Sequence, residues 1–399
     1  MSMENTVSAE RLHISFFGRR NVGKSSLVNR ITGQSLSVVS DVLGTTTDPV
    51  KKSMELLPLG PVVIIDTPGF DDEGELGQLR VQKTKEILTK TDIAVFVVDA
   101  SKDLSDEEKK FIVDLDNKKI PYVVVYNKSD LLAEKPSEKD NSIWVSANTS
   151  YGIEALKEKL GELAKKNNNC KRIIADLLKE GDMVVLVTPI DESAPKGRLI
   201  LPQQQTIRDI LDAKCTTVVC QVEELQGVLE LLRKPPKMVV TDSQAFGKVA
   251  KIVPNDIPLT SFSILFARYK GDLAILVQGA AMLSKLKDGD KILISEGCTH
   301  HRQCGDIGTV KMPMWISKFA DADIQMEFTS GGEFSEDLSE YKLVVHCGGC
   351  MLNETEMKNR ILTAVEKGVP IVNYGVAIAH MNGILRRSLE LFPEVMELL

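Results

Sequence analysis

Residues 18–25 read G-R-R-N-V-G-K-S, a spacing of glycines, lysine and serine that suits the binding of phosphate. The glycines let backbone N–H groups turn toward phosphate oxygens. Lys24 can reach the β- and γ-phosphates, and the Ser25 hydroxyl can bind Mg²⁺. A helix that begins here adds a favourable partial charge at its N-terminus. The run predicts a P-loop in which Gly23, Lys24, Ser25 and Ser26 contact the nucleotide.

A second motif, "DTPG", follows a run of apolar residues and supplies groups for the metal and the terminal phosphate. Asp66 can hold the shell of the Mg²⁺ ion, and the Gly69 N–H can meet the γ-phosphate. We therefore expect Lys24, Asp66 and Gly69 to take part in hydrolysis of a bound triphosphate.

Two further motifs, "NKSD" and "SAN", predict that the base is guanine. The Asp130 carboxylate can accept from N1–H and from the 2-amino group, whereas adenine offers neither donor and is rejected. The Asn127 amide and the Lys128 stem would support the base. The backbone at Ser146 and Ala147 can present N–H to guanine O6. Together with the P-loop, the order and spacing are highly specific for a GTPase.

A separate group of thiols and imidazoles lies in "EGCTHHRQCGDIG" and "HCGGC". Cys298, Cys347 and Cys350 could form an iron–sulfur site that leaves one iron open to an exchangeable ligand. The same thiols with His300 or His346 could form a closed Cys₃His zinc site. A thioredoxin-like Cys-x-x-C pair and metal-free buried thiols are the other interpretations. The residues alone do not separate zinc from iron–sulfur.

Alternating β-strands and α-helices are expected to position these groups. Near-continuous Val and Ile runs ("HISFFG", "VVIIDTPG", "IAVFVVDA", "PYVVVYNKSD", "SIWVSAN") predict buried parallel strands separated by helices, an α/β doubly wound domain. Each nucleotide motif then lies at a strand C-terminus. Cys298 follows "KILIS", and Cys347 follows "KLVV". If both strands are parallel members of one sheet, their ends share an edge.

The chain divides into three predicted α/β domains: 1–167, 172–265 and 266–399, with a polar linker "KKNNNC" after the first. In the second, "RIIADLLKEGDMVVLVTPI" predicts a helix and then a strand, and "DESAPKGRLILPQQQ" predicts a loop. In the third, "GILRRSLELF" predicts a closing helix.

Composition narrows the class of protein. The 399 residues are 43% hydrophobic and 26% charged, with no apolar run of membrane-spanning length and no secretory signal at the start. We expect a cytoplasmic protein without a membrane segment. A net charge of −7 and the absence of a basic run weigh against nucleic acid as a partner. Seven cysteines, four of them between residues 298 and 350, favour free thiols or metal ligands over disulfides.

The first domain resembles translation-factor-class GTPases of the Era-like, tRNA-modifying and ribosome-assembly branch. "GTTTDPV" is similar to that branch's switch I. The resemblance implies that Thr46, with Thr45 as the alternate, binds Mg²⁺ and that Asn21 coordinates K⁺. Phe70 stands where Ras-like enzymes place a glutamine that orients water, so unaided hydrolysis is expected to be slow. K⁺, a switch carboxylate or a partner would then assist it.

The whole chain resembles the [FeFe]-hydrogenase maturation GTPases, the HydF family, through C-x-H, a long gap and H-C-x-x-C after a GTPase domain. The resemblance implies a [4Fe-4S] cluster on Cys298, Cys347 and Cys350. His300 and His346 would then lie near the open iron. It also implies a homodimer formed through the middle domain. The C-terminal domain would be the iron–sulfur cluster-binding domain.

Two residues close to Cys298 in sequence, Cys304 and Asp306, have alternative roles at that site. Asp306 could be the labile oxygen ligand of the open iron, although a solvated turn residue is an equal interpretation. Cys304 falls outside the pattern and is expected to be a spectator.

The expected function is a GTP-binding and hydrolysing scaffold, with GTP, Mg²⁺, a [4Fe-4S] cluster and K⁺ as cofactors. By resemblance, it takes a diiron precursor from radical-SAM maturases and delivers it to apo-[FeFe]-hydrogenase. The alternative is an RNA-modification or ribosome-assembly GTPase with a structural zinc in its C-terminal domain. A third class is a GTP-dependent adaptor whose thiols hold no metal.

Overall fold

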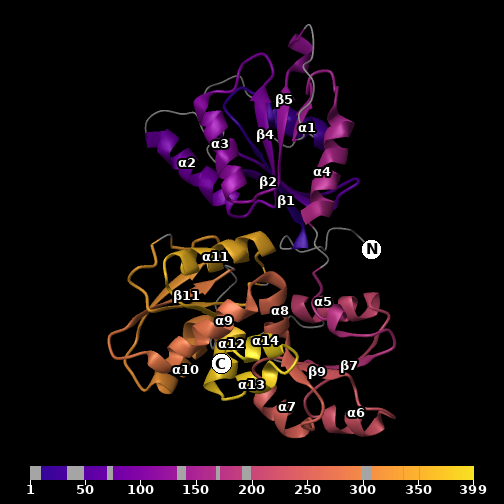
Figure 1. Ribbon diagram of the computed structural model, residues 1–399, viewed down its shortest axis with the longest axis vertical. Helices are drawn as coiled ribbons and strands as arrows, with labels where there is room; N and C mark the ends of the chain where they lie inside the picture. Colours follow the sequence, from indigo (N-terminus) through magenta and orange to yellow (C-terminus); the bar gives the residue numbers. More distant parts are fainter. Residues whose placement is uncertain are drawn as a thin grey trace. The chain divides into compact units, whose positions relative to one another are not determined.

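The computed structural model describes residues 10–33, 49–69, 75–132, 141–167, 171–190, 199–297, 307–335, 337–349 and 351–399 (Figure 1). The chain forms two compact units, Met1–Cys170 and Lys171–Leu399.

A six-stranded sheet forms the centre of the first unit. Its order is β2-β3-β1-β4-β5-β6, and all neighbours are parallel except β2 and β3. The five strands expected from the Val and Ile runs are present, which confirms the α/β fold of this unit. The strands are β1 (Leu12–Phe17), β2 (Val50–Leu56), β3 (Gly60–Asp66), β4 (Ile93–Asp99), β5 (Tyr122–Asn127) and β6 (Ser142–Trp144).

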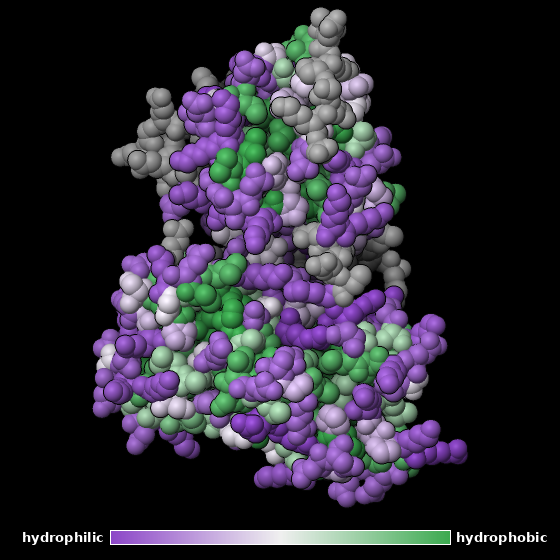
Figure 2. Space-filling view, in the orientation of Figure 1, coloured by the Kyte–Doolittle hydropathy of each residue, from purple (hydrophilic) through white to green (hydrophobic). Residues whose placement is uncertain are grey.

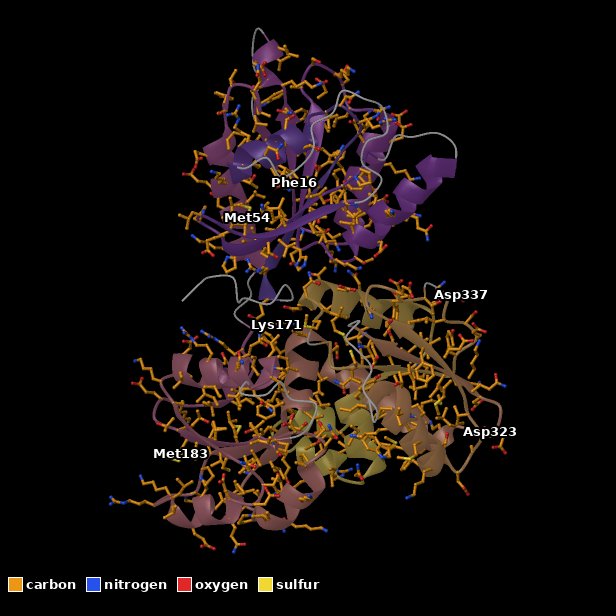
Figure 3. The ribbon with its side chains drawn as sticks, turned by 180° about the vertical axis from the view of Figure 1, so that it is seen from behind. Phe16, Met54, Lys171, Met183, Asp323 and Asp337 are labelled. Atoms are coloured by element: carbon orange, nitrogen blue, oxygen red, sulfur yellow. The ribbon has the colours of Figure 1, made fainter. Side chains whose placement is uncertain are left out.

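Helices cover both faces of this sheet, as buried runs of Val and Ile require. Helices α1 (Lys24–Thr32) and α4 (Ile153–Asn167) pack on one face, in a core that includes Phe16. Helices α2 (Glu75–Leu88) and α3 (Asp106–Asn117) pack on the other face (Figure 1). Figure 3 labels Phe16 within the sheet.

The second unit contains two parallel four-stranded sheets. The first has the order β10-β9-β7-β8. Its strands are β7 (Met183–Val187, with Met183 labelled in Figure 3), β8 (Thr216–Cys220), β9 (Met238–Thr241) and β10 (Leu259–Ser261). Its helices are α5 (Leu201–Asp212), α6 (Leu225–Leu231), α7 (Phe246–Ile252) and α8 (Phe262–Lys270).

The second of these sheets has the order β12-β11-β13-β14, and Cys347 follows directly after its strand β13. Its strands are β11 (Lys291–Glu296), β12 (Gln325–Ser330), β13 (Leu343–His346) and β14 (Ile371–Asn373). Its helices are α9 (Leu273–Ala280), α10 (Met312–Ala320), α11 (Glu354–Glu366), α12 (Tyr374–Met381), α13 (Leu385–Ser388) and α14 (Pro393–Met396).

One buried core joins the two sheets of this unit. It runs from Leu186 of β7 through Phe266 of α8 to Val344 of β13. Helix α9 approaches β14 closely because Gly279 has no side chain: a Cβ there would lie 2.0 Å from the carbonyl oxygen of Ile371. The two sheets therefore share one continuous hydrophobic core and form a single compact unit.

Three local predictions in this unit were wrong. The helix expected before β7 is a single 3₁₀ turn, Ala175–Leu177. There the Asp209 carboxylate accepts three consecutive backbone N–H groups at 2.8–2.9 Å and so competes with helical pairing. The loop predicted over 191–205 ends early, because α5 begins at Leu201. The predicted closing helix is only the four-residue α13.

On the face drawn in Figure 2, hydrophilic side chains cover most of each unit, with apolar residues in patches between them. Among the described residues, no helix has both the length and the apolar character needed to span a membrane.

Candidate functional site

The P-loop connects β1 to α1 with a tight backbone turn. Gly23 has φ +89°, in the left-handed region, and α1 begins at Lys24. A Cβ on Gly23 would lie 2.3 Å from Asn127 Nδ2, so only glycine fits. That amide group donates to the Val22 carbonyl at 2.9 Å, which ties the base-binding motif to the phosphate loop.

The groups expected to hold phosphate and Mg²⁺ converge at the C-terminal ends of β1 and β3. The buried Lys24 Nζ donates to the carbonyls of Gly18 at 2.9 Å and Arg19 at 2.7 Å. Ser25 Oγ donates to Asp66 Oδ2 at 2.6 Å. The other oxygen, Oδ1, is buried and has no hydrogen-bond partner within the described part of the chain. A hydroxyl beside an unsatisfied carboxylate oxygen suits a divalent cation with oxygen ligands.

A cavity of about 820 Å³ lies beside this loop and has the lining expected for a base. It is lined by Gly23, Ser26, Asn127, Lys128 and Asp130, and also by Asn29, Arg30, Gly33, Leu131, Ala147 and Asn148. The structure therefore brings the predicted base-binding residues to one hollow. A hydrogen bond from the Ser146 side chain holds the pKa of Asp130 below its usual range, which favours the carboxylate needed to accept from guanine.

The rest of the base motif is fixed by contacts that the sequence analysis did not foresee. Lys128 Nζ pairs with Asp99 Oδ2 at 2.7 Å. Burial acts to raise the pKa of Asp99, but this hydrogen bond brings it below its usual range. The Ala147 N–H, which we expected to point at guanine O6, donates to Asn127 Oδ1 at 3.1 Å. Asp99 ends β4 beside the motif, a position that could have identified it.

Arg30 is a second residue that sequence reasoning missed. It lies on α1, and its guanidinium donates to the carbonyls of Ala147 at 3.0 Å and Asn148 at 3.2 Å. The P-loop helix thus holds the "SAN" loop from outside. No local motif marks this role, because the two segments are 117 residues apart.

The other residues predicted around the phosphates fall partly within the described ranges. Thr45, Thr46 and Phe70 lie outside the described residues. Asn21 is exposed and has φ +59°, a conformation that asparagine tolerates better than most residues. Gly69 is buried just after β3.

The ends of β11 and β13, which lead into the two thiol segments, lie side by side, and we call this place the thiol edge. Strands β11 and β13 are parallel neighbours, with Ser295 opposite His346, which confirms the expected arrangement. Cys347 Sγ accepts the Gly297 N–H at 3.0 Å and the Gly349 N–H at 3.4 Å. Gly349 needs its left-handed φ of +62° to make this turn. Two backbone N–H groups are thus directed at one sulfur.

His346 is fully buried, and both ring nitrogens are engaged. Nδ1 contacts the Cys347 carbonyl at 2.7 Å, and Nε2 contacts Arg360 Nη1 at 3.0 Å. Because an arginine only donates and a carbonyl only accepts, the proton belongs on Nδ1. This arrangement favours a structural role for His346 over that of an iron ligand.

Arg360 is the centre of the network beneath this edge. It is 3% exposed and pairs with Glu356 at 2.9 Å. It also donates to the Gly331 carbonyl at 2.6 Å and approaches Ser295 Oγ at 3.4 Å. The sequence shows only an ordinary i,i+4 pair here, so the role of this pair was missed.

The remaining predicted ligands, Cys298, Cys350, His300 and Asp306, lie outside the described residues, as does Cys304. Among the residues that are described, no group of three or more His, Cys, Asp or Glu side chains is placed to hold a metal ion. Cys347 is the single described member of the predicted ligand set that presents sulfur at this edge.

Three family models match the chain. The 50S ribosome-binding GTPase model matches residues 13–128. The Hydrogen maturase F dimerization domain matches residues 173–271, and the Hydrogen maturase F tetramerization domain matches residues 274–391. The last two together span more than half of the chain. The first domain is therefore a GTPase domain, and two self-association domains follow it.

Relatives match only in part. The tRNA modification GTPase MnmE of Clostridioides difficile (strain 630) is 35% identical over 178 residues, 42% of this chain and 38% of that protein. MnmE of Thiobacillus denitrificans is 33% identical over 159 residues, 39% of this chain and 34% of that protein. The chain thus spans little more than a third of the length of these curated relatives. A solved structure of a probable GTP-binding protein engB is 25% identical, with a TM-score of 0.31; the match covers 39% of this chain and 99% of that one.

Proposed function

The chain belongs to the hydrogen maturase F family, and from this premise we propose that it is a GTP-hydrolysing scaffold that carries a [4Fe-4S] cluster. Cys298, Cys347 and Cys350 hold the cluster in this proposal. The cargo is a diiron precursor, received from radical-SAM maturases and passed to apo-[FeFe]-hydrogenase.

The observation that carries the proposal is the hydrogen bond from the Gly297 N–H to Cys347 Sγ, at 3.0 Å. Gly297 is the residue before Cys298 in the chain. The backbone that leads to the predicted ligand Cys298 therefore contacts the sulfur of the predicted ligand Cys347. Gly297 and Cys347 are 50 residues apart in the chain. Parallel pairing of β11 with β13 explains how both segments reach the same edge.

The residues fit a sulfur-bound cluster in their chemistry. Backbone N–H groups directed at a cysteine sulfur are among the contacts by which proteins tune such clusters. When bound with three thiolates, the cluster supplies one iron that an exchangeable ligand can occupy. This chain's own residues fix the turn: Gly349 supplies the required backbone conformation, and His346 braces the Cys347 carbonyl.

The nucleotide half of the proposal rests on the GTPase domain. Lys24 and Ser25 bind the phosphates and Mg²⁺, Asp66 completes the metal shell, and Asp130 selects guanine. Asn21 coordinates K⁺, which stimulates an otherwise slow hydrolysis. The nucleotide state orders or releases the switch loops and so modulates partner contacts. The chain acts as a homodimer through its middle domain.

Metal analysis of anaerobically purified full-length protein tests the cluster. We expect brown protein that contains both iron and acid-labile sulfide. Cys347→Ser should lose most of the iron, whereas Cys220→Ser, at a buried cysteine of β8, should keep it. Colourless protein that carries stoichiometric zinc would contradict the proposal.

The tRNA-modification relatives support a second candidate, an RNA-modification GTPase with a structural zinc. Salt-sensitive binding of RNA together with zinc would favour it. The matches of both hydrogen maturase F domains over 173–391 make it the weaker of the two candidates.

A further inference from the structure

A buried lysine reaches the turn that follows β13. Lys270 is the last residue of α8, and its side chain is 4% exposed. Its Nζ donates to the carbonyls of Gly349 at 3.3 Å and Leu352 at 2.9 Å. We call the segment from Cys347 to Leu352 the thiol turn; residue 350 within it lies outside the described residues.

The two hydrogen bonds act on the part of the chain that orients the sulfur. Gly349 receives Lys270 on its carbonyl oxygen, while its N–H faces Cys347 Sγ at 3.4 Å. The N–H of Leu352 closes the turn on the same Gly349 carbonyl at 3.1 Å. The ammonium group therefore holds the carbonyl of Gly349, the same residue whose N–H is directed at the sulfur.

Lys270 also places a positive charge in a buried position at the site. An ammonium group is strongly hydrated, so its burial is costly unless hydrogen bonds or negative charge compensate. The two carbonyl oxygens help to compensate for this cost, and an anionic, thiolate-bound cluster would be attracted to the same charge. Arg360, the other buried cation near this edge, already pairs with Glu356 at 2.9 Å.

Lys270 and the thiol turn belong to different family-model matches. Lys270 lies within residues 173–271, the dimerization-domain match, whereas the thiol turn lies within the tetramerization-domain match. Helix α8 also contacts α11, the helix that follows the thiol turn (Figure 1). A residue of the dimerization-domain match thus supports the sulfur-bearing turn of the tetramerization-domain match.

We propose that Lys270 is a positioning residue for the thiol turn and a fixed positive charge that stabilises the reduced state of a cluster bound there. The second half of this proposal rests on the cluster of the proposed function. The first half concerns the protein's own backbone and holds for the metal-free chain.

The first test measures the turn without metal. Metal-free full-length protein is treated with iodoacetamide, and alkylation of Cys347 is followed by mass spectrometry. Lys270→Met keeps the length of the side chain but removes its donors. At about pH 10, where the thiol is deprotonated in both proteins and the rate reports access to the sulfur, it should raise the rate roughly 2- to 10-fold. Lys270→Arg should stay closer to the unaltered protein. An unchanged rate in Lys270→Met would overturn the positioning role.

The control is Lys291→Met. Lys291 begins β11, at the opposite end of the strand from the thiol edge, and pairs with Glu327 and Glu340 on the surface. Removal of this charge should leave alkylation of Cys347 unchanged. Equal acceleration in both variants would show a general loosening of the domain and contradict the role of Lys270.

The second test measures how the charge of Lys270 affects the midpoint potential of the cluster. Iron- and sulfide-loaded protein is titrated with dithionite, and the one-electron reduction is followed by electron paramagnetic resonance. Lys270→Met should move the midpoint to a more negative potential, because the reduced cluster carries one more negative charge. Lys291→Met should move it less. A midpoint that is the same in Lys270→Met and the unaltered protein would overturn the electrostatic role.

The two tests also separate this inference from the proposed function. If the unaltered protein takes up no iron and sulfide, the proposed function and the electrostatic role both fail. The alkylation rates still decide the positioning role in that case. If Lys270→Met does not fold, Lys270→Gln, which retains a donor but not the charge, is measured in its place against Lys270→Arg.

Discussion

The nucleotide site and the thiol edge are both formed at the C-terminal ends of parallel strands, but they differ in how their parts reach one another. The nucleotide site is formed mainly by short motifs whose residues are expected to touch the ligand, and Asp99 and Arg30 hold two of these motifs in place from other elements. At the thiol edge, Lys270 and Arg360 support Cys347 from elements that carry no motif of their own. Local motifs report the groups that touch a ligand, whereas the groups that hold them come from the fold.

The largest expected effect separates the two sites. Lys24→Met should reduce GTP hydrolysis on the order of 10²-fold or more, because the phosphates lose their positive charge. The iron content of the same variant should be unchanged, since the thiol edge is formed in the other compact unit. Hydrolysis is measured by phosphate release and iron by colorimetric assay. Loss of iron in this variant would show that the two sites are not independent.

The next prediction concerns the base. Asp130→Asn should reduce the preference for GTP over xanthosine triphosphate on the order of 10²-fold, because the amide exchanges an acceptor for a donor. Competition binding with a fluorescent nucleotide measures the preference. Asp106→Asn, at an exposed residue in the first turn of α3, is the control. If Asp130→Asn kept its preference for GTP, the assignment of this residue would be wrong.

At the thiol edge, the buried pair should matter for stability. Arg360→Met leaves Glu356 charged and buried and should lower the free energy of unfolding of the second unit by about 3–5 kcal/mol. Urea unfolding of metal-free protein measures the change. Lys358→Met removes the partly exposed pair with Glu354, which has the same i,i+4 spacing on α11, and should cost about 0–1 kcal/mol. Equal costs in the two variants would contradict the role assigned to Arg360.

A smaller effect is expected for the support that α1 gives to the base loop. Arg30→Met removes the hydrogen bonds to the carbonyls of Ala147 and Asn148 and should weaken GTP binding roughly 2- to 10-fold. Isothermal titration calorimetry measures the affinity. Arg30→Lys should recover part of it. An affinity unchanged in Arg30→Met would show that the loop holds its own conformation.

The smallest expected effect is that of pH on the preference for GTP over xanthosine triphosphate. Because the Ser146 hydrogen bond lowers the pKa of Asp130 below its ordinary value of 3.8, the carboxylate persists as the pH falls toward that value. The preference for GTP over xanthosine triphosphate should therefore stay constant between about pH 7 and pH 5. A loss of preference within this range, followed by competition binding, would show that another group selects the base.

The sequence alone was sufficient for much of the fold and of the nucleotide site. The Val and Ile runs predicted the strands of the GTPase domain, because burial on both faces leaves little freedom in composition. The parallel pairing of β11 with β13 was anticipated as a condition and is confirmed. Asp66 lies beside Ser25, and Asp130 lines the cavity next to the P-loop, while the roles assigned to both residues stay predictions.

The remainder depended on contacts between distant segments. The helix predicted before β7 is a 3₁₀ turn because Asp209 of α5, 34 to 36 residues later, takes its N–H groups. No motif marks Lys270, and the role proposed for it rests on its burial and its contacts. A pattern of residue types reports local propensity, while such contacts are set by which elements become neighbours.

The most direct test of the account is a comparison of bound iron in three single variants of the full-length protein, loaded anaerobically with iron and sulfide. Cys298→Ser and Cys347→Ser should each lose most of the iron and the electron paramagnetic resonance signal of the reduced cluster. Cys215→Ser should retain both, because the thiol of Cys215 contacts the carbonyl of Lys179 at 3.0 Å, in the middle domain. Full retention of iron in either of the first two variants would contradict the claim that the ends of β11 and β13 share one metal site.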